Sequence, residues 1–172
     1  MLKPKNNFKV VTDKKTARVI LPNMLTLIGV CIGLTSIRFA LDGRFEFAIV
    51  AIILAAVIDG LDGRIARLIK GTSKVGKELD SLTDMISFGV APAFIMYFWK
   101  LNTLGRFGWL VCLIYVICVA LRLARFNVNT GQDPSWRDNF FEGVPSPAGG
   151  ILVLTPLIFS LTNYEFTQIN YN

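Results

Sequence analysis

Five long apolar segments dominate this sequence and restrict what it can fold into. They cover Pro22–Leu41, Phe45–Leu61, Leu82–Trp99, Phe107–Leu123 and Val144–Leu161. A helix needs about 20 mostly apolar residues to cross a bilayer, and each segment approaches that length. The chain is 53% hydrophobic, which is more than a soluble domain usually contains. The sequence therefore predicts an all-α, polytopic integral membrane protein, a helical bundle with one embedded domain.

Polar segments flank the embedded domain. Residues 1–21 carry six Lys and Arg residues, and we interpret them as a basic juxtamembrane segment. Pro22 suits the start of a helix, so we expect the embedded domain at residues 22–163. Residues 164–172 form a polar tail that is too short to cross a bilayer. Within the third segment, Gly89 and Pro92 predict a kink or a close helix contact.

Two pairs of aspartates lie where the second apolar segment ends and the third begins. Asp59 and Asp62 are three residues apart, and Asp80 and Asp84 are four apart, so each pair shares one face of a helix. A hairpin of the two helices brings the four carboxylates together, where they repel one another unless a cation neutralises them. Oxygen ligands select hard cations such as Mg²⁺, Mn²⁺ or Ca²⁺. The alternative is ordinary helix-terminal acids paired with neighbouring basic residues, but ionisable groups at the edge of membrane segments are usually functional.

Several classes of chemistry are excluded by composition. The chain has no histidine, which removes histidine general bases and Ser-His-Asp triads. Its three cysteines lie in apolar segments without CxxC spacing, so we expect neither a zinc site nor a disulfide framework. The net charge is +6, and the basic residues flank membrane segments. Their expected partners are therefore the anionic headgroups of the lipid bilayer and not nucleic acid.

The distribution of basic residues predicts the orientation. Fourteen of the eighteen Lys and Arg residues fall on the side of the acidic pairs, in the N-terminal segment, around the turn that follows Asp62, and after the fourth apolar segment. Cytoplasmic loops are enriched in Lys and Arg. We therefore expect a multi-pass protein of the cytoplasmic membrane, with the acidic pairs and the N-terminus facing the cytoplasm.

The acidic pairs belong to a longer pattern. From Asp59 to Asp84 the sequence reads D-x2-D-G-x2-A-R-x8-G-x3-D-x3-D, which resembles the signature of the CDP-alcohol phosphotransferase family. The stretches LDSLTDMISFGVAPA, RLARFN and GVPSPAGG are similar to bacterial members that use serine. The resemblance covers roughly Pro22 to Leu161 and implies a dimeric membrane enzyme with six spanning helices. Since five are recognisable, we expect the sixth to be missing or truncated.

The resemblance also implies a reaction. Such an enzyme transfers the phosphatidyl group of CDP-diacylglycerol to the hydroxyl of L-serine, releasing CMP and forming phosphatidylserine, with one or two Mg²⁺ or Mn²⁺ ions. By the resemblance, Asp59, Asp62, Asp80 and Asp84 are the metal ligands, and Asp84 is also the catalytic base. This agrees with the general logic of phosphoryl transfer, in which a cation neutralises developing charge while a carboxylate takes the hydroxyl proton.

The remaining site residues expected from the resemblance are small or polar. CDP and its phosphates are assigned to Asn23, Thr26, Gly63, Ala66, Arg67 and Gly76, and the serine to Arg122, Arg125, Asn127 and Ser146. Small residues leave room for the nucleotide, and guanidinium groups bind phosphate or carboxylate with two hydrogen bonds. The alternative for the two arginines after the fourth segment is anchoring at the membrane surface.

Other functions remain open. One alternative is an enzyme of the same fold that uses another acceptor alcohol, such as glycerol 3-phosphate or inositol phosphate. A protein of another class, a divalent-cation transporter or channel, would also use an acidic cluster, but it would place acids near the middle of the membrane and not at one side. A third possibility is an inactive membrane fragment.

Overall fold

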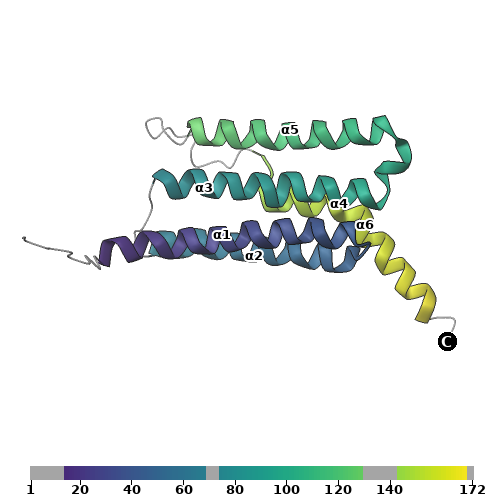
Figure 1. Cartoon of the computed structure of the whole chain (residues 1–172), viewed down its shortest axis with the longest axis horizontal. Coiled ribbons are helices and arrows are strands. Elements are labelled where there is room, and N and C mark those ends of the chain that lie inside the picture. Colours follow the sequence, from purple (N-terminus) through teal and green to yellow (C-terminus); the bar gives the residue numbers. More distant parts are fainter. Residues whose placement is uncertain (1–13, 69–73, 130–142, 170–172) are drawn as a thin grey trace, which may run out of the picture.

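The computed structural model describes residues 14–68, 74–129 and 143–169, and their regular structure is entirely helical. The elements are α1 (Lys14–Leu41), α2 (Phe45–Leu68), α3 (Lys74–Asp84), the π-helix η1 (Met85–Val90), α4 (Ala91–Trp99), the short 3₁₀ helix η2 (Leu101–Leu104), α5 (Arg106–Asn129) and α6 (Ser146–Ile169). Because α3, η1 and α4 follow one another without a break, the described residues form five long rods, which lie side by side (Figure 1).

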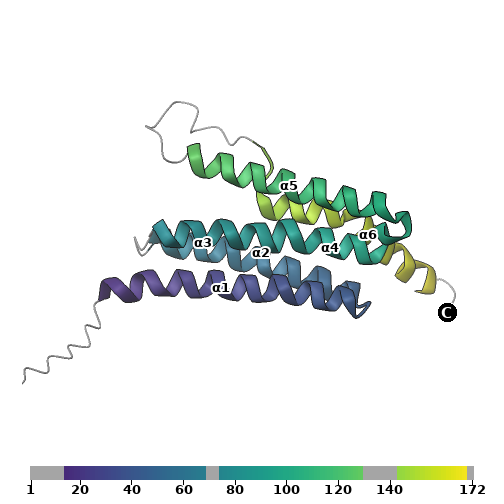
Figure 2. The same cartoon turned by 45° about the horizontal axis from the view of Figure 1, so that its top comes forward.

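Four of these rods are long and apolar enough to cross a membrane. They are Pro22–Leu41, Val75–Trp99, Arg106–Val128 and Ser146–Asn163. The helix α2 has 24 residues but carries acidic residues near both ends, and it runs alongside α1 (Figure 2). The predicted all-α, multi-pass membrane architecture is confirmed.

Two helix ends differ from the prediction. Pro22 opens the apolar span but does not begin the helix, because α1 starts eight residues earlier at Lys14. Pro22 is therefore an interior proline, and its carbonyl oxygen lies 3.0 Å from the Thr26 hydroxyl oxygen. At the other end of the chain, α6 continues to Ile169, into residues predicted to be a tail. Both extensions mix polar and apolar residues, so a search for long apolar segments does not include them.

Alanines and larger apolar residues together fill the contacts between the helices. The buried apolar core contains residues of α1, α2, η1, α4 and α6: Ala40, Ala48, Ile49, Ile52, Ala55, Phe88, Ala91, Ile95, Leu154 and Leu157. Small side chains let helices approach closely, which is the usual basis of packing in membranes. The helix α5 lies outside this core, and most of its large apolar side chains are exposed, as expected of a lipid-facing helix.

The site lies at one end of the bundle. The chain runs up and down through the helices, so the end of α2, the start of α3 and the end of α5 lie toward the same end as the first turns of α1, and α6 begins further along the bundle (Figures 1 and 2). Elements that are distant in sequence therefore present their polar termini together.

The third rod is irregular at the predicted place. Between Asp84 and Pro92 the α-helix gives way to the six-residue π-helix η1. Pro92 has no N–H to donate to the carbonyl oxygen of Phe88, four residues earlier. The Tyr115 hydroxyl of α5 donates to that oxygen instead, at 2.7 Å.

Candidate active site

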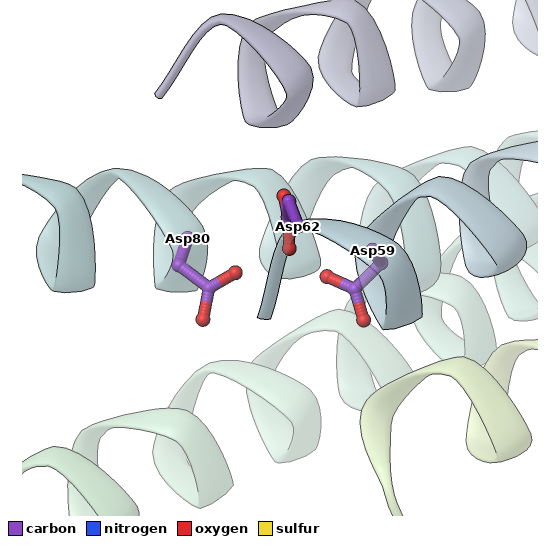
Figure 3. A group of neighbouring side chains, drawn as sticks. All are labelled: Asp59, Asp62 and Asp80. Carbon is purple, nitrogen blue, oxygen red and sulfur yellow. The ribbon is translucent and has the colours of Figure 1, made fainter. Parts of the chain in front are cut away.

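Three carboxylates from two helices converge at the polar end of the bundle. Asp59 and Asp62 project from α2, and Asp80 projects from α3 (Figure 3). One carboxylate oxygen from each lies within 4.8 Å of the others. Asp62 is buried, Asp59 is partly buried and Asp80 is exposed, so the group is closed on the α1 side and open on another. The hairpin predicted from the sequence does bring these carboxylates together.

This geometry suits a hard divalent cation. Oxygens that share one Mg²⁺ or Ca²⁺ lie 2.0–2.6 Å from the ion, so they are separated by at most about 4–5 Å. Without a cation, each pair of charges at such a distance repels by about 1–4 kcal/mol, depending on the effective dielectric constant. The donor set is oxygen only, which favours magnesium, manganese or calcium over zinc. The residues present therefore fit a metal of this kind.

Thr26 holds one of these carboxylates in place. Its buried hydroxyl lies 2.8 Å from Asp62 Oδ2 and donates to it. We assigned Thr26 to the nucleotide, but its contact in the structure is with a metal-ligand candidate. The sequence carried a signal for this role, since Thr26 lies four residues inside the apolar span that begins at Pro22, at the depth of the acidic pairs.

Asp84 lies beside the three-oxygen group and not within it. Its partly buried carboxylate interacts with Asp59 of α2 and Ser146 of α6, and it is close enough to Arg122 of α5 for their charges to interact. Its Oδ1 atom is buried and has no hydrogen-bond partner among the described residues. Asp84 therefore links the carboxylate cluster to the polar residues of α5 and α6.

Arg122 and Ser146 form the opposite wall of the site. Arg122 Nη1 donates to Ser146 Oγ at 2.9 Å, whereas its buried Nε has no partner in the described parts of the chain. Gly143 has a φ of 97°, which favours glycine, and a Cβ there would lie 3.7 Å from Arg122 Nε. Of the four residues assigned to serine, these two are the ones that reach Asp84.

The other two residues assigned to serine, Asn127 and Arg125, differ in their contacts and exposure. Asn127 Nδ2 donates to Ser81 Oγ at 2.9 Å, which ties the end of α5 to α3 next to Asp80. Ser81 was not among the predicted site residues, and only its position between two motif aspartates indicated a role. Arg125 is exposed on α5.

The residues assigned to CDP come from α1, α2 and α3, the helices that carry the cluster or contact it. Asn23 is partly buried on α1, Gly76 is partly buried on α3, and Gly63 has nothing within 4 Å of the place where a Cβ would be. The exposed Arg67 donates from Nε to the Gly63 carbonyl oxygen at 3.1 Å. Ala66 lies in α2, but its side chain is outside the described residues. The open space beside Gly63 leaves room for a ligand.

Fold and site define a class: a multi-pass helical membrane protein with an acidic, cation-suited centre at one end of its bundle. The family model of the CDP-alcohol phosphatidyltransferases matches residues 19–169. The chain belongs to this family, whose members are metal-dependent.

Several characterised proteins are similar to this chain. The CDP-diacylglycerol–serine O-phosphatidyltransferase of Mycobacterium leprae is 47% identical over 144 residues, which is 83% of this chain and 48% of the relative. The enzyme of that name from Helicobacter pylori (strain 26695) is 40% identical over 151 residues, covering 88% of this chain and 62% of the relative. The archaetidylserine synthase of Methanothermobacter thermautotrophicus is 35% identical over 161 residues, which is 90% of this chain and 64% of the relative. The chain thus spans about half to two thirds of the length of these relatives.

Proposed function

We propose that this protein transfers the phosphatidyl group of CDP-diacylglycerol to the hydroxyl of L-serine, giving phosphatidylserine and CMP. The observation that carries the proposal is the juxtaposition of Asp59, Asp62 and Asp80 with Asp84 and, beyond it, Arg122. The names of the relatives, three of which were described above, favour serine over glycerol 3-phosphate or inositol phosphate as the acceptor.

The reaction is a displacement at phosphorus. The serine Oγ–P bond forms, the bond between that phosphorus and the CMP oxygen breaks, and CMP leaves with the electron pair. Asp84 takes the serine hydroxyl proton, and its Oδ1 atom, which is buried and has no hydrogen-bond partner among the described residues, supports this role. Asp59, Asp62 and Asp80 hold the cation, for which we propose Mg²⁺ or Mn²⁺; when bound, it neutralises charge on the diphosphate.

Serine recognition is assigned to α5 and α6. A carboxylate is best held by a guanidinium group with free N–H donors, and Arg122 Nε is buried without a partner in the described residues. Ser146 orients the same guanidinium through Nη1. Asn127 and the exposed Arg125 remain proposed contacts at the edge of this wall, with weaker support.

CDP is assigned to the open face of the cluster. Gly63 leaves space there, and Arg67 supplies a cationic group, while Asn23, Ala66 and Gly76 complete the proposed nucleotide contacts. Thr26 acts in this proposal through Asp62.

The surroundings of the site are part of the proposal. We infer that the site faces the cytoplasm, because exposed arginines lie near the helix ends on the acidic side: Arg64 and Arg67 at the end of α2 and Arg125 near the end of α5. We also propose that residues 22–163 form the catalytic domain and that the protein is a homodimer, as the family resemblance implies; crosslinking in native membranes tests the dimer.

The test is release of CMP by the purified protein in lipid nanodiscs. With CDP-diacylglycerol present, release should require both L-serine and Mg²⁺ or Mn²⁺, and Asp59→Asn should abolish it. A matched control is Asp42→Asn, which removes an aspartate that lies between α1 and α2, at the opposite end from Asp59, and pairs with exposed Arg38. Serine-independent release, or cation flux through the protein in liposomes without any CMP release, would contradict the proposal.

A further inference from the structure

The π-helix η1 begins directly after Asp84, and its position has a geometric consequence. Asp84, Phe88, Ala91 and Ile95 are spaced four, three and four residues apart, so a continuous α-helix would place them on one stripe. Phe88, Ala91 and Ile95 are all members of the buried apolar core. An uninterrupted helix would therefore point Asp84 toward that core.

The π turn removes this conflict. It accommodates one extra residue, which rotates everything before it by about 100° relative to everything after it. Asp84 consequently leaves the apolar stripe and lies beside Asp59 and Ser146. π turns of this kind often occur at functional sites.

Contacts from three other helices hold η1 in this form. From α5, the Tyr115 hydroxyl donates to the Phe88 carbonyl oxygen, which Pro92 leaves without an α-helical donor. From α6, Gly150 lies so close that a Cβ there would be 3.3 Å from the Cα, Cβ and oxygen of Phe88. From α1, the Gly29 carbonyl oxygen accepts a hydrogen bond from Ser87 Oγ at 3.4 Å.

We propose that the π turn is a positioning device for the acidic centre and that Tyr115 is the positioning residue that stabilises it. The inference deepens the proposed function, on which it rests, because the turn sets where Asp80 and Asp84 stand relative to Asp59 and Asp62. Tyr115 touches no substrate; it acts through the Phe88 carbonyl oxygen on the rod that carries the two aspartates.

Two matched pairs of variants test the proposal. Tyr115→Phe removes only the hydroxyl, and Tyr97→Phe makes the same change in a ring that packs on Phe98 and Trp109 at the other end of the rod. Gly150→Ala presses on Phe88, whereas a Cβ at the neighbouring Gly149 meets nothing within 4 Å. The measurements are Mn²⁺ affinity by electron paramagnetic resonance, the metal-free melting temperature, and kcat for CMP release.

We expect Tyr115→Phe and Gly150→Ala to weaken Mn²⁺ binding about tenfold, the usual scale for outer-shell support, and to lower kcat at saturating Mn²⁺. Tyr97→Phe and Gly149→Ala should match the parent protein in both. The inference is overturned if Tyr115→Phe binds Mn²⁺ like Tyr97→Phe, even with a lowered melting temperature. If Tyr115→Phe does not fold, equal Mn²⁺ affinities of the two glycine variants overturn it. A protein that binds Mn²⁺ as expected but releases no CMP would contradict the proposed function and leave the affinity test valid.

Discussion

Asp62 is the most enclosed of the three clustered carboxylates, because Thr26 donates to it from α1 and only 4% of its surface is exposed. Asp80, on the opposite side of the group, is exposed. A cation bound between them therefore has one fixed, well-supported ligand and one that solvent and substrate reach. Substitutions around Asp62 should act on metal affinity, whereas those around Asp84 should act on the rate.

Thr26→Val should weaken Mn²⁺ binding about 10- to 100-fold, since it removes the hydrogen bond that orients Asp62 and leaves the shape nearly unchanged. Thr35→Val is the matched control, because Thr35 lies on the same helix and its hydroxyl donates only to the Cys31 carbonyl oxygen. Electron paramagnetic resonance of free Mn²⁺ measures the Mn²⁺ affinity of each variant. Equal affinities would show that Asp62 does not need Thr26.

Asp84→Asn should lower kcat by about 10²–10⁴-fold, the range for loss of a general base, because the amide cannot take the serine proton. Mn²⁺ affinity should fall less than in Asp59→Asn, since Asp84 lies outside the three-oxygen group. Single-turnover CMP release at saturating Mn²⁺ is the measurement. Turnover near the parent rate would assign the base to another group.

Arg122→Ala should raise the KM for L-serine by about 10-fold or more, as expected when a charged hydrogen bond worth about 1.5–3 kcal/mol is lost. The KM for CDP-diacylglycerol should change little, and Arg106→Ala, an exposed arginine at the other end of α5, is the control. Similar increases for both substrates in Arg122→Ala would instead indicate a role in holding α5 against α6 through Ser146.

At the scale of elements, the rods α2 and α3 meet so that carboxylates from the end of one and the start of the other converge. The sequence predicted this, because helical spacing and the ends of the apolar segments are both readable without a structure. The sequence did not predict that the irregularity in this helix would be a π turn. Gly89 and Pro92 indicated an irregularity, but the phenol that satisfies Phe88 comes from α5, 27 residues away in sequence. Contacts that depend on the packing of separate helices are invisible to local patterns.

The close approach of α1 to η1 should make Gly33 intolerant of a side chain. A Cβ at this position would lie 2.4 Å from Ser87 Oγ and 3.0 Å from its Cα, so Gly33→Ala forces the two helices apart. We expect a loss of stability of about 1–3 kcal/mol, the usual cost of overpacking. Gly60→Ala, which meets nothing within 4 Å, should not destabilise. Thermal unfolding without metal compares the two; equal melting temperatures would contradict the packing described here.

At the scale of the whole molecule, the charge asymmetry agrees with the position of the site. Basic residues at the polar end of the bundle were readable from sequence, as were the four aspartates. The roles of Thr26 and Ser81 were not, because each depends on a partner that only the fold supplies, Asp62 for one and Asn127 for the other. The sequence thus predicted the carboxylates of the site, but it did not predict the residues that hold them and their helices in place.

The proposed orientation predicts a labelling pattern in sealed cells, in a background without the native cysteines. A cysteine at the exposed position Arg64 should react with an impermeant maleimide only after the membrane is opened. A cysteine at the exposed position Asn102, in the short helix η2 that joins α4 to α5, should react from outside. The reverse pattern would overturn the orientation.

The most direct test of the central proposal is product analysis with acceptors offered in parallel. The protein in nanodiscs receives CDP-diacylglycerol, Mg²⁺ or Mn²⁺, and equal concentrations of labelled L-serine, glycerol 3-phosphate and inositol phosphate, and the lipids formed are separated. Label should enter lipid from serine, in amounts equal to the CMP released, and the Asp84→Asn variant should incorporate little. Lipid labelled mainly from one of the other two acceptors, with serine left unused, would contradict the proposal that this protein makes phosphatidylserine.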